Sequence, residues 1–286
     1  PYTIRPNVNI NFLWQLTGAK CCIWNQRDEG RGFSKQKYRD KILWFALKNT
    51  SGFISNSQDG FQFLQSYIPE TKPMVAVNNG VLVNSPKSSR EQVLKALGLS
   101  SDAFIAIMVA NLTRYKDHFT LIEAWKQFIV STPGEKLPVL FLAGKLAETT
   151  DEIKLQISVL GLEEHVRLLG TVQDINSLIH ASDLCLFSSQ YEGVPNGILE
   201  SMAASKAVIA SNIPGIREAL GGDYPYLCQV GAHLSMAGHI TALFKDGERR
   251  NHLGKRNKIR IMEKFSVENL GNESLKFINS LLNEKD

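Results

Sequence analysis

The feature that most constrains the fold of this chain is an alternation, from about residue 100 onward, of short apolar runs with segments of helical periodicity. The apolar runs are too short for helices and too continuous for strands with one face in water. Strands that alternate with helices at this spacing predict a doubly wound parallel sheet with right-handed crossovers. The expected strands are 104–110, 137–144, 165–170, 183–187 and 207–211, and the expected helices are 117–130, 149–162, 174–181, 195–204 and 213–220.

The first third of the chain repeats this pattern in a shorter form. Residues 20–24, 52–57 and 74–80 are expected strands, and residues 38–50 and 58–67 are expected helices. The polar stretch SPKSSR at 85–90 is typical of a linker. The α/β pattern therefore predicts three parts: a partial Rossmann-like domain at 1–84, a complete one at 85–262, and a C-terminal helix at 263–286.

Composition narrows the class of protein. Hydrophobic residues make up 43% of the chain and charged residues 21%, which is ordinary for a soluble globular protein. The sequence contains no run long enough for a membrane-spanning helix, and its beginning does not resemble a signal peptide. The four cysteines lack metal-ligand spacing, which favours reduced thiols and a cytoplasmic location. Because the first residue is Pro1, both a processed chain and a fragment are open.

Positive charge is concentrated in the first third. Residues 1–88 hold 11 Lys and Arg against 5 Asp and Glu, a net charge of +6, whereas the remainder carries a net charge of −2. Such a bias suits an anionic partner, such as a phosphorylated lipid or a membrane surface. An ordinary solvated surface explains the same numbers, and both interpretations stay open.

The stretch YEGVPNGILESMA at 191–203 is the strongest functional signal. A proline at the start of a helix after a buried strand leaves the first amides pointing at a ligand, and those amides favour phosphate. Asn196 and Glu200 are four residues apart and share one side of this helix, where a carboxylate can accept the hydroxyls of a ribose. Glu192 precedes the helix and is placed to accept hydroxyls of a second sugar. The alternative is one helix-capping acid and one surface acid.

This stretch resembles the E-x7-E motif of the retaining, family 4 type glycosyltransferases, also called group 1, which have the GT-B fold. Further matches follow in the family's order: SNSQDGFQFL, VNNGV, MVANLTRYKDHFTLIEAW, LFLAGK, and the segment from VRLLGTVQ to GIREAL. The resemblance therefore covers nearly the whole chain from about residue 50. It implies a GT-B architecture, in which the C-terminal helix returns to the first domain, and retention of the anomeric configuration. Glu192 would then orient the sugar without attacking it.

The resemblance also implies residues that bind the donor. Lys116 matches a phosphate-binding lysine of the family, and Asn111 stands where the family has an arginine. Arg114 is expected to supply the missing cation, unless it faces solvent. Cations here would stabilise the charge that develops on the leaving diphosphate. The remaining donor contacts are expected from Gly144, Lys145, the backbone of Thr171 and Val172, and the stretch Gly193, Val194, Pro195, Asn196, Gly197 and Glu200.

No metal or other cofactor is expected. The sequence has no D-x-D motif, and its six histidines show no metal-ligand grouping. A lysine, an arginine and a helix terminus would neutralise the diphosphate instead of a divalent ion. The sequence therefore predicts metal-independent activity.

The acceptor side departs from the family pattern. Relatives carry a first domain of about 150 or more residues, whereas residues 1–84 form only part of one. The segment 24–33 lies near an active-site histidine of the family but contains none. Candidate acceptor-side residues are Gln26, Arg27, Asp28, Asn79 and Gly80.

The expected helix at 38–50 mixes basic with apolar side chains, as relatives do that dock on anionic membranes at the inner face. The basic residues are Arg39, Lys41 and Lys48, and the apolar group is Ile42, Leu43, Trp44, Phe45 and Leu47. Packing of an apolar helix on its own sheet explains the same pattern and is favoured.

The sequence predicts a retaining, metal-independent glycosyltransferase. Its donor would be a nucleotide-diphosphate sugar, with UDP favoured, and its acceptor a glycan or a lipid-linked glycan. The alternative is a nucleotide-sugar-binding fragment in which the incomplete first domain prevents efficient transfer. A GT-B type epimerase or sugar phosphorylase is a third reading, which the loop and glutamate pattern disfavours. No nucleic-acid partner is expected.

Overall fold

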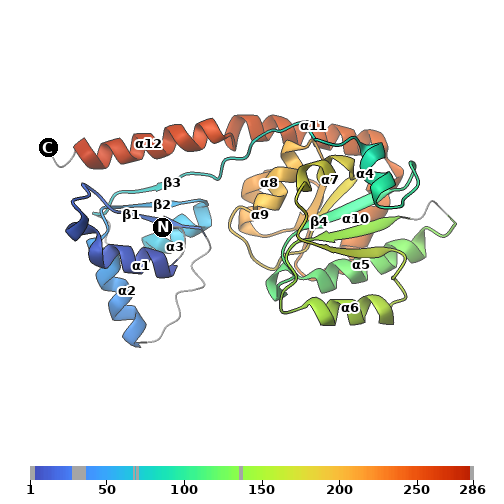
Figure 1. Cartoon of the computed structure of the whole chain (residues 1–286), viewed down its shortest axis with the longest axis horizontal. Coiled ribbons are helices and arrows are strands. Elements are labelled where there is room, and N and C mark those ends of the chain that lie inside the picture. The colour runs from blue at the N-terminus through green and yellow to red at the C-terminus, as the bar shows by residue number, and fades with distance from the viewer. Residues whose placement is uncertain (1–3, 28–36, 67, 69–70, 135–137, 284–286) are drawn as a thin grey trace. The chain divides into compact units, whose positions relative to one another are not determined.

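The computed structural model describes residues 4–27, 37–66, 68, 71–134 and 138–283 of the chain. It divides into two compact units (Figure 1). The first unit comprises Pro1–Gly80, Glu192–Val194 and Lys264–Asp286, and the second comprises Val81–Tyr191 and Pro195–Glu263. The boundaries at 84/85 and 262/263 stay a prediction from the sequence.

The first unit is built on a three-stranded parallel sheet in the order β1-β2-β3. The strands are β1 (Ile23–Gln26), β2 (Gly52–Ser55) and β3 (Met74–Ala76). The helices are α1 (Ile4–Leu13), η1 (Trp14–Thr17), α2 (Lys37–Asn49), α3 (Gln58–Gln65) and α12 (Val267–Asn283). The expected strands at 20–24 and 74–80 are therefore displaced and shortened. Beyond β3 the amide of Val77 still donates to β2, to the carbonyl oxygen of Ser55 at 2.8 Å.

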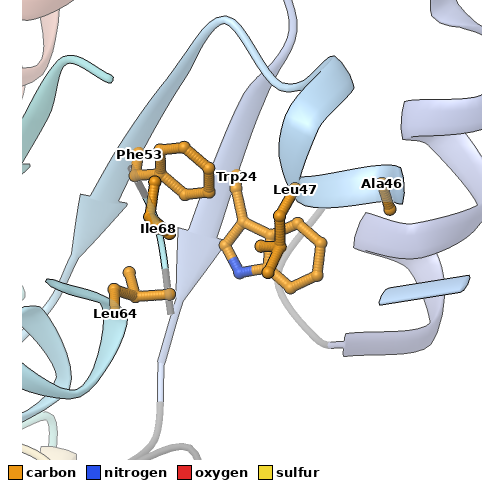
Figure 2. Packing of buried hydrophobic residues seen from close by; sticks show 6 residues of the cluster. All are labelled: Trp24, Ala46, Leu47, Phe53, Leu64 and Ile68. Carbon is orange, nitrogen blue, oxygen red and sulfur yellow. The ribbon is translucent and has the colours of Figure 1, made fainter. Parts of the chain in front are cut away.

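The core of the first unit gathers around two large aromatic side chains (Figure 2). Trp24 of β1 and Phe53 of β2 are fully buried, with ring centroids 6.4 Å apart. Helix α12 packs closely on the same unit, because a Cβ at Gly52 would lie 2.7 Å from the side chain of Leu281. The C-terminal helix thus packs on the first unit. The remaining core residues are Ala46, Leu47, Leu64 and Ile68.

The second unit contains a six-stranded parallel sheet in the order β6-β5-β4-β7-β8-β9. Its strands are β4 (Ile105–Val109), β5 (Val139–Ala143), β6 (Val166–Gly170), β7 (Leu184–Phe187), β8 (Val208–Ser211) and β9 (Leu227–Cys228). All residues of β5, β7 and β8 are buried, which explains their continuous apolar sequences. The strand order reverses between β4 and β7. Ligands of open α/β sheets bind at such a switch point, outside the carboxyl ends of the strands.

Helices cover both faces of this sheet (Figure 1). Helices α5 (His118–Ser131), α6 (Thr150–Val159) and α10 (His233–Lys245) pack together on one face. Helices α4 (Arg90–Ala96), α7 (Ile175–Ala181), α8 (Asn196–Ala203) and α9 (Pro214–Leu220) form the other layer. The 3-10 turn η2 (Arg114–Lys116) precedes α5, and α11 (Gly247–Lys264) follows α10. Within the described residues, no helix combines the length and the apolar character needed to cross a membrane.

Candidate functional site

Lys116 lies in a short turn at the carboxyl end of β4. The next residue, Asp117, adopts a left-handed conformation (φ 53°) and caps α5 by accepting a hydrogen bond from the amide of Thr120 at 3.3 Å. Such a conformation is uncommon for residues other than glycine, so the surrounding contacts must hold it. The sharp turn separates Lys116 from the axis of α5.

The turn that carries Lys116 is tied to the loop that follows β7. The buried hydroxyl of Ser188 donates to the carbonyl oxygens of Lys116 and Asp117, at 3.1 and 2.8 Å. The amide of Gln190 donates to the carbonyl oxygen of Tyr115 at 2.8 Å. These bonds join the two loops on either side of the switch point. The amino end of α8 follows the second of these loops.

His118 is buried beneath this turn, with 1% of its surface exposed. Within the part of the chain that the structure describes, neither ring nitrogen has a hydrogen-bond partner. Burial, together with the charge of Lys116, lowers the pKa of His118 to about 4. The imidazole is therefore neutral at physiological pH.

Helix α8 begins directly after Pro195, whose extended backbone (φ −75°, ψ 127°) turns the chain into the helix. Gly197 in its first turn lies against the sheet, because a Cβ there would come within 2.6 Å of the carbonyl oxygen of Val109 and 3.0 Å of the ring of Phe187. The glycine thus lets α8 approach β4 and β7 closely, which is a packing role beyond the ligand access that the sequence indicated. The amino end of α8 is fixed at the switch point.

Glu200 lies one turn into α8, on the side that it shares with Asn196. Burial raises the pKa of its carboxyl group above the ordinary value. No other described residue donates a hydrogen bond to this half-buried carboxylate. A ligand with hydroxyl groups would therefore provide the partners that the protein itself does not.

The two other candidates of the β4 loop are held by protein contacts. Arg114 forms an exposed ion pair with Glu152 at 2.6 Å, and its amide donates to Glu148 at 3.1 Å. Asn111 accepts a hydrogen bond from the amide of Lys145 at 3.0 Å. The structure thus directs the guanidinium of Arg114 toward α6. To serve as a diphosphate cation, it would have to leave Glu152.

Several predicted donor-site residues lie where the carboxyl ends of the neighbouring strands β4, β5 and β6 come close together. A Cβ at Gly144 would collide with the carbonyl group of Ala110, and the Gly144 amide donates to the carbonyl oxygen of Gly170 at 2.9 Å. Thr171 and Lys145 are exposed. Val172 is half-buried and lines a cavity of about 360 Å³ between α4 and α7. Gly144 is thus required by the close approach of the strands.

The acceptor-side candidates of the first unit have different environments. Gln26 is buried, and its Oε1 accepts a hydrogen bond from the indole of Trp24 at 3.1 Å. At Gly80 a Cβ would lie 2.7 Å from the Cα of Val267, so this glycine permits close packing of α12. Both residues thus have structural contacts, and their acceptor role stays a prediction. Asp28 lies outside the described residues.

Arg27 and Asn79 are brought together, since the guanidinium of Arg27 donates to Oδ1 of Asn79 at 2.5 Å. Glu192, Gly193 and Val194 group with this unit, whereas Lys116 and Glu200 belong to the second. The two glutamates of the motif therefore belong to different units. Among the described residues, no group of three or more His, Cys, Asp or Glu could hold a metal ion.

Sequence reasoning missed the residues that support Lys116. Ser188 lies in the polar stretch that follows an apolar strand, and only its buried, doubly bonded hydroxyl reveals its role. Asp117 and His118 belong to the quoted motif around Lys116, but no periodicity marks the left-handed turn between them. An Asp that precedes a helical segment is a capping signal, and it was available from the sequence.

The fold agrees with comparisons to known proteins. A family model for glycosyl transferases group 1 matches residues 89–260. N-acetyl-alpha-D-glucosaminyl L-malate synthase of Bacillus anthracis is 28% identical over 64% of this chain and 47% of its own length. UDP-Gal:alpha-D-GlcNAc-diphosphoundecaprenol alpha-1,3-galactosyltransferase of Escherichia coli is 27% identical over 74% of this chain and 49% of its own. The chain thus spans about half the length of these curated relatives.

Among solved structures, HepE of Anabaena in complex with UDP-glucose superposes with a TM-score of 0.85 at 22% identity. The alignment covers 97% of this chain and 77% of that one, and at this identity it shows the fold, which is of the GT-B type. The family match covers more than half of the chain and includes the β4 loop, the β7 loop and α8. The chain belongs to the glycosyl transferases group 1 family.

Proposed function

We propose that this chain is a retaining glycosyltransferase that moves a sugar from a UDP-linked donor to a glycan or a lipid-linked acceptor in the cytoplasm. Family membership supports sugar transfer. The lipid-linked acceptor is suggested by the name of the E. coli relative, and UDP by the HepE complexes.

The observation that carries this proposal is the arrangement at the switch point of the second sheet. Ser188 ties the turn of Lys116 to the loop that leads to α8, and α8 carries a half-buried Glu200 to which no described residue donates a hydrogen bond. An ammonium group and a helix amino end both favour a diphosphate. A carboxylate that only accepts hydrogen bonds suits the two hydroxyls of a ribose.

In the proposed mechanism, Lys116 and the first amides of α8 stabilise the negative charge that develops on the departing UDP. Glu200 fixes the ribose, and the backbone of Thr171 and Val172 contacts the base. Glu192 orients the transferred sugar by accepting its hydroxyls. The departing phosphate takes the proton of the acceptor hydroxyl on the same face of the sugar, so retention needs no protein nucleophile.

Titration of the whole chain with UDP tests this assignment. We expect Lys116→Met and Glu200→Gln each to weaken UDP binding by tenfold or more, because each removes a charge-assisted hydrogen bond worth about 1.5–3 kcal/mol. Lys255→Met is the matched control, because Lys255 is an exposed lysine of α11 in the same unit and is not among the predicted donor contacts. Unchanged affinity in both site variants would contradict the proposal.

Transfer must be measured apart from binding. Incubation with a panel of UDP-sugars and lipid-linked acceptors in the presence of EDTA tests turnover and metal independence together. Retained transfer supports both claims. Loss of transfer in EDTA that manganese restores would overturn metal independence. Tight donor binding without transfer to any acceptor would favour the alternative of a nucleotide-sugar-binding chain.

A peripheral membrane contact completes the proposal. In α2, Leu47 and Ala46 face the core, whereas Trp44 and Phe45 are about half exposed. Phe45 stacks on the exposed Phe12 of α1 at 5.0 Å. Exposed apolar residues of these two helices also include Ile10, Leu13 and Ile42, and the exposed basic ones are Lys41 and Lys48. Packing on the sheet therefore explains only part of the apolar pattern.

Basic and aromatic side chains on one surface suit an anionic bilayer. Sedimentation with phosphatidylglycerol vesicles, compared with phosphatidylcholine vesicles, tests this contact. We expect binding to the anionic vesicles alone and a marked loss in the double variant Lys41→Gln/Lys48→Gln. Equal sedimentation of the variant would refute the membrane contact and leave the donor site untouched.

A further inference from the structure

Two charged residues of the proposed donor site are each preceded by a tyrosine. Tyr115 immediately precedes Lys116, and Tyr191 immediately precedes Glu192. Their rings stack, with centroids 4.9 Å apart and an angle of 20° between the planes. The stack therefore joins the β4 loop to the end of the β7 loop through two rings, in addition to the hydrogen bonds from Ser188 and Gln190.

Tyr115 also contacts the lysine itself. Nζ of Lys116 lies 5.2 Å from the centroid of the Tyr115 ring, within the range of a cation–π interaction. The carbonyl oxygen of Tyr115 is held by the amide of Gln190 at 2.8 Å, so the backbone beneath the ring is fixed as well. Each ring is half-buried, which leaves it partly shielded from water.

We propose that Tyr115 and Tyr191 are positioning residues that hold Lys116 ready for the donor diphosphate. A free lysine side chain occupies many rotamers and must lose that freedom when it binds a phosphate. A ring that already restrains the ammonium group lowers this cost, and the stack on Tyr191 restrains the ring. This inference rests on the proposed function, because it assigns the two rings to the same site.

The rings, rather than their hydroxyl groups, carry this role. Stacking and the cation–π contact both depend on the aromatic face. Tyr115→Phe should therefore behave like the original chain, whereas Tyr115→Leu should not. A ring that only fills space on the surface would be replaced by leucine with little effect on the ligand.

The test compares UDP with uridine by calorimetric titration of the whole chain. Tyr115→Leu should weaken UDP binding about tenfold, a factor within the range of one lost stack and one lost cation–π contact. It should leave uridine binding unchanged, because uridine has no phosphate for Lys116. Tyr115→Phe should restore UDP affinity, and Tyr191→Leu should reproduce part of the loss.

Two further variants make the result specific. In a Lys116→Met background, Tyr115→Leu should cause no additional loss of UDP affinity, since its effect acts through the lysine. Tyr226→Leu is the matched control, because Tyr226 is a half-buried tyrosine of the same unit in an aromatic pair with His239 at 5.1 Å. It should leave UDP affinity unchanged.

The outcomes separate the inference from the function. Unchanged UDP affinity in Tyr115→Leu, or an equal loss for uridine, would overturn the positioning role even where Lys116→Met abolishes UDP binding. Unchanged UDP affinity in Lys116→Met would instead refute the proposed donor site, and the inference with it.

Discussion

The two units of this chain share one building pattern but differ in how completely it is carried through. The second unit has six parallel strands, with helices on both faces and strands buried along nearly their whole length. The described residues of the first form three strands, and α1, η1 and α2 leave large apolar side chains exposed, among them Leu16 (83%), Leu13 (58%) and Trp44 (54%). The proposed donor site therefore rests on the more completely covered of the two sheets. The described helices α1 and α2 of the first unit leave apolar side chains exposed to solvent.

The largest expected effect separates the stabilities of the two units. Trp24→Ala removes the central side chain of the first core (Figure 2) and should destabilise that unit by about 3–5 kcal/mol. Hydrogen exchange should show lost protection in β1 and β2 and retained protection in β4, β5 and β7. Equal loss of protection in both sheets would show that the units unfold as one.

The second expected effect is a pH dependence confined to the second unit. Because the pKa of His118 falls from 6.5 to about 4 on folding, the unfolded chain binds a proton more readily. Above pH 6.5 the protonation of His118 leaves the free energy of unfolding nearly unchanged. That free energy falls as the pH drops from 6.5 toward 4, by about 3 kcal/mol in total. Denaturant titrations at pH 7.5 and 4.5 measure it. His118→Phe should flatten the difference, and an unchanged slope in that variant would contradict the assignment.

A smaller effect tests the close packing at the carboxyl ends of the second unit's strands. Gly144→Ala brings a Cβ into the carbonyl group of Ala110 and should destabilise the unit by about 1–3 kcal/mol. Gly238→Ala in α10, where a Cβ meets open space, should instead stabilise it by up to about 1 kcal/mol. Thermal unfolding measures both variants. A lower Tm for Gly144→Ala and a higher Tm for Gly238→Ala would support this packing, and equal changes in Tm would contradict it.

The smallest effect concerns Arg114. Its exposed ion pair with Glu152 should contribute less than about 1 kcal/mol to stability. Arg114→Gln should also weaken UDP binding less than Lys116→Met, because the structure holds this guanidinium against α6. A loss as large as that of Lys116→Met would show that the arginine leaves Glu152 to bind the diphosphate.

The same contrast explains what the sequence could predict. In the second unit, fully buried parallel strands read as continuous apolar runs, and each expected strand from 104–110 to 207–211 appears within a few residues of its predicted place. Helix α10 was missed, although its sequence HLSMAGHITALFK packs on α5. It follows a two-residue strand, β9, that is too short to show a pattern.

In the first unit the boundaries were less predictable. Helix α1 (IRPNVNINFL) mixes polar asparagines with apolar residues. Its Asn7 and Asn11 are buried, and their side-chain amides donate hydrogen bonds to backbone carbonyl oxygens, which no hydrophobic periodicity predicts. The candidate site shows the same limit. The motif identified Lys116, Asn196 and Glu200 as candidates, but the ion pair of Arg114 and the tether from Ser188 depend on residues far apart in sequence.

The proposed function depends most on where the nucleotide binds, and a crystal structure of the whole chain with UDP measures this directly. We expect the diphosphate at Nζ of Lys116 and the first amides of α8, with the ribose hydroxyls on Glu200. UDP bound elsewhere, for example in the cavity between α4 and α7, with none at the switch point between β4 and β7, would contradict it.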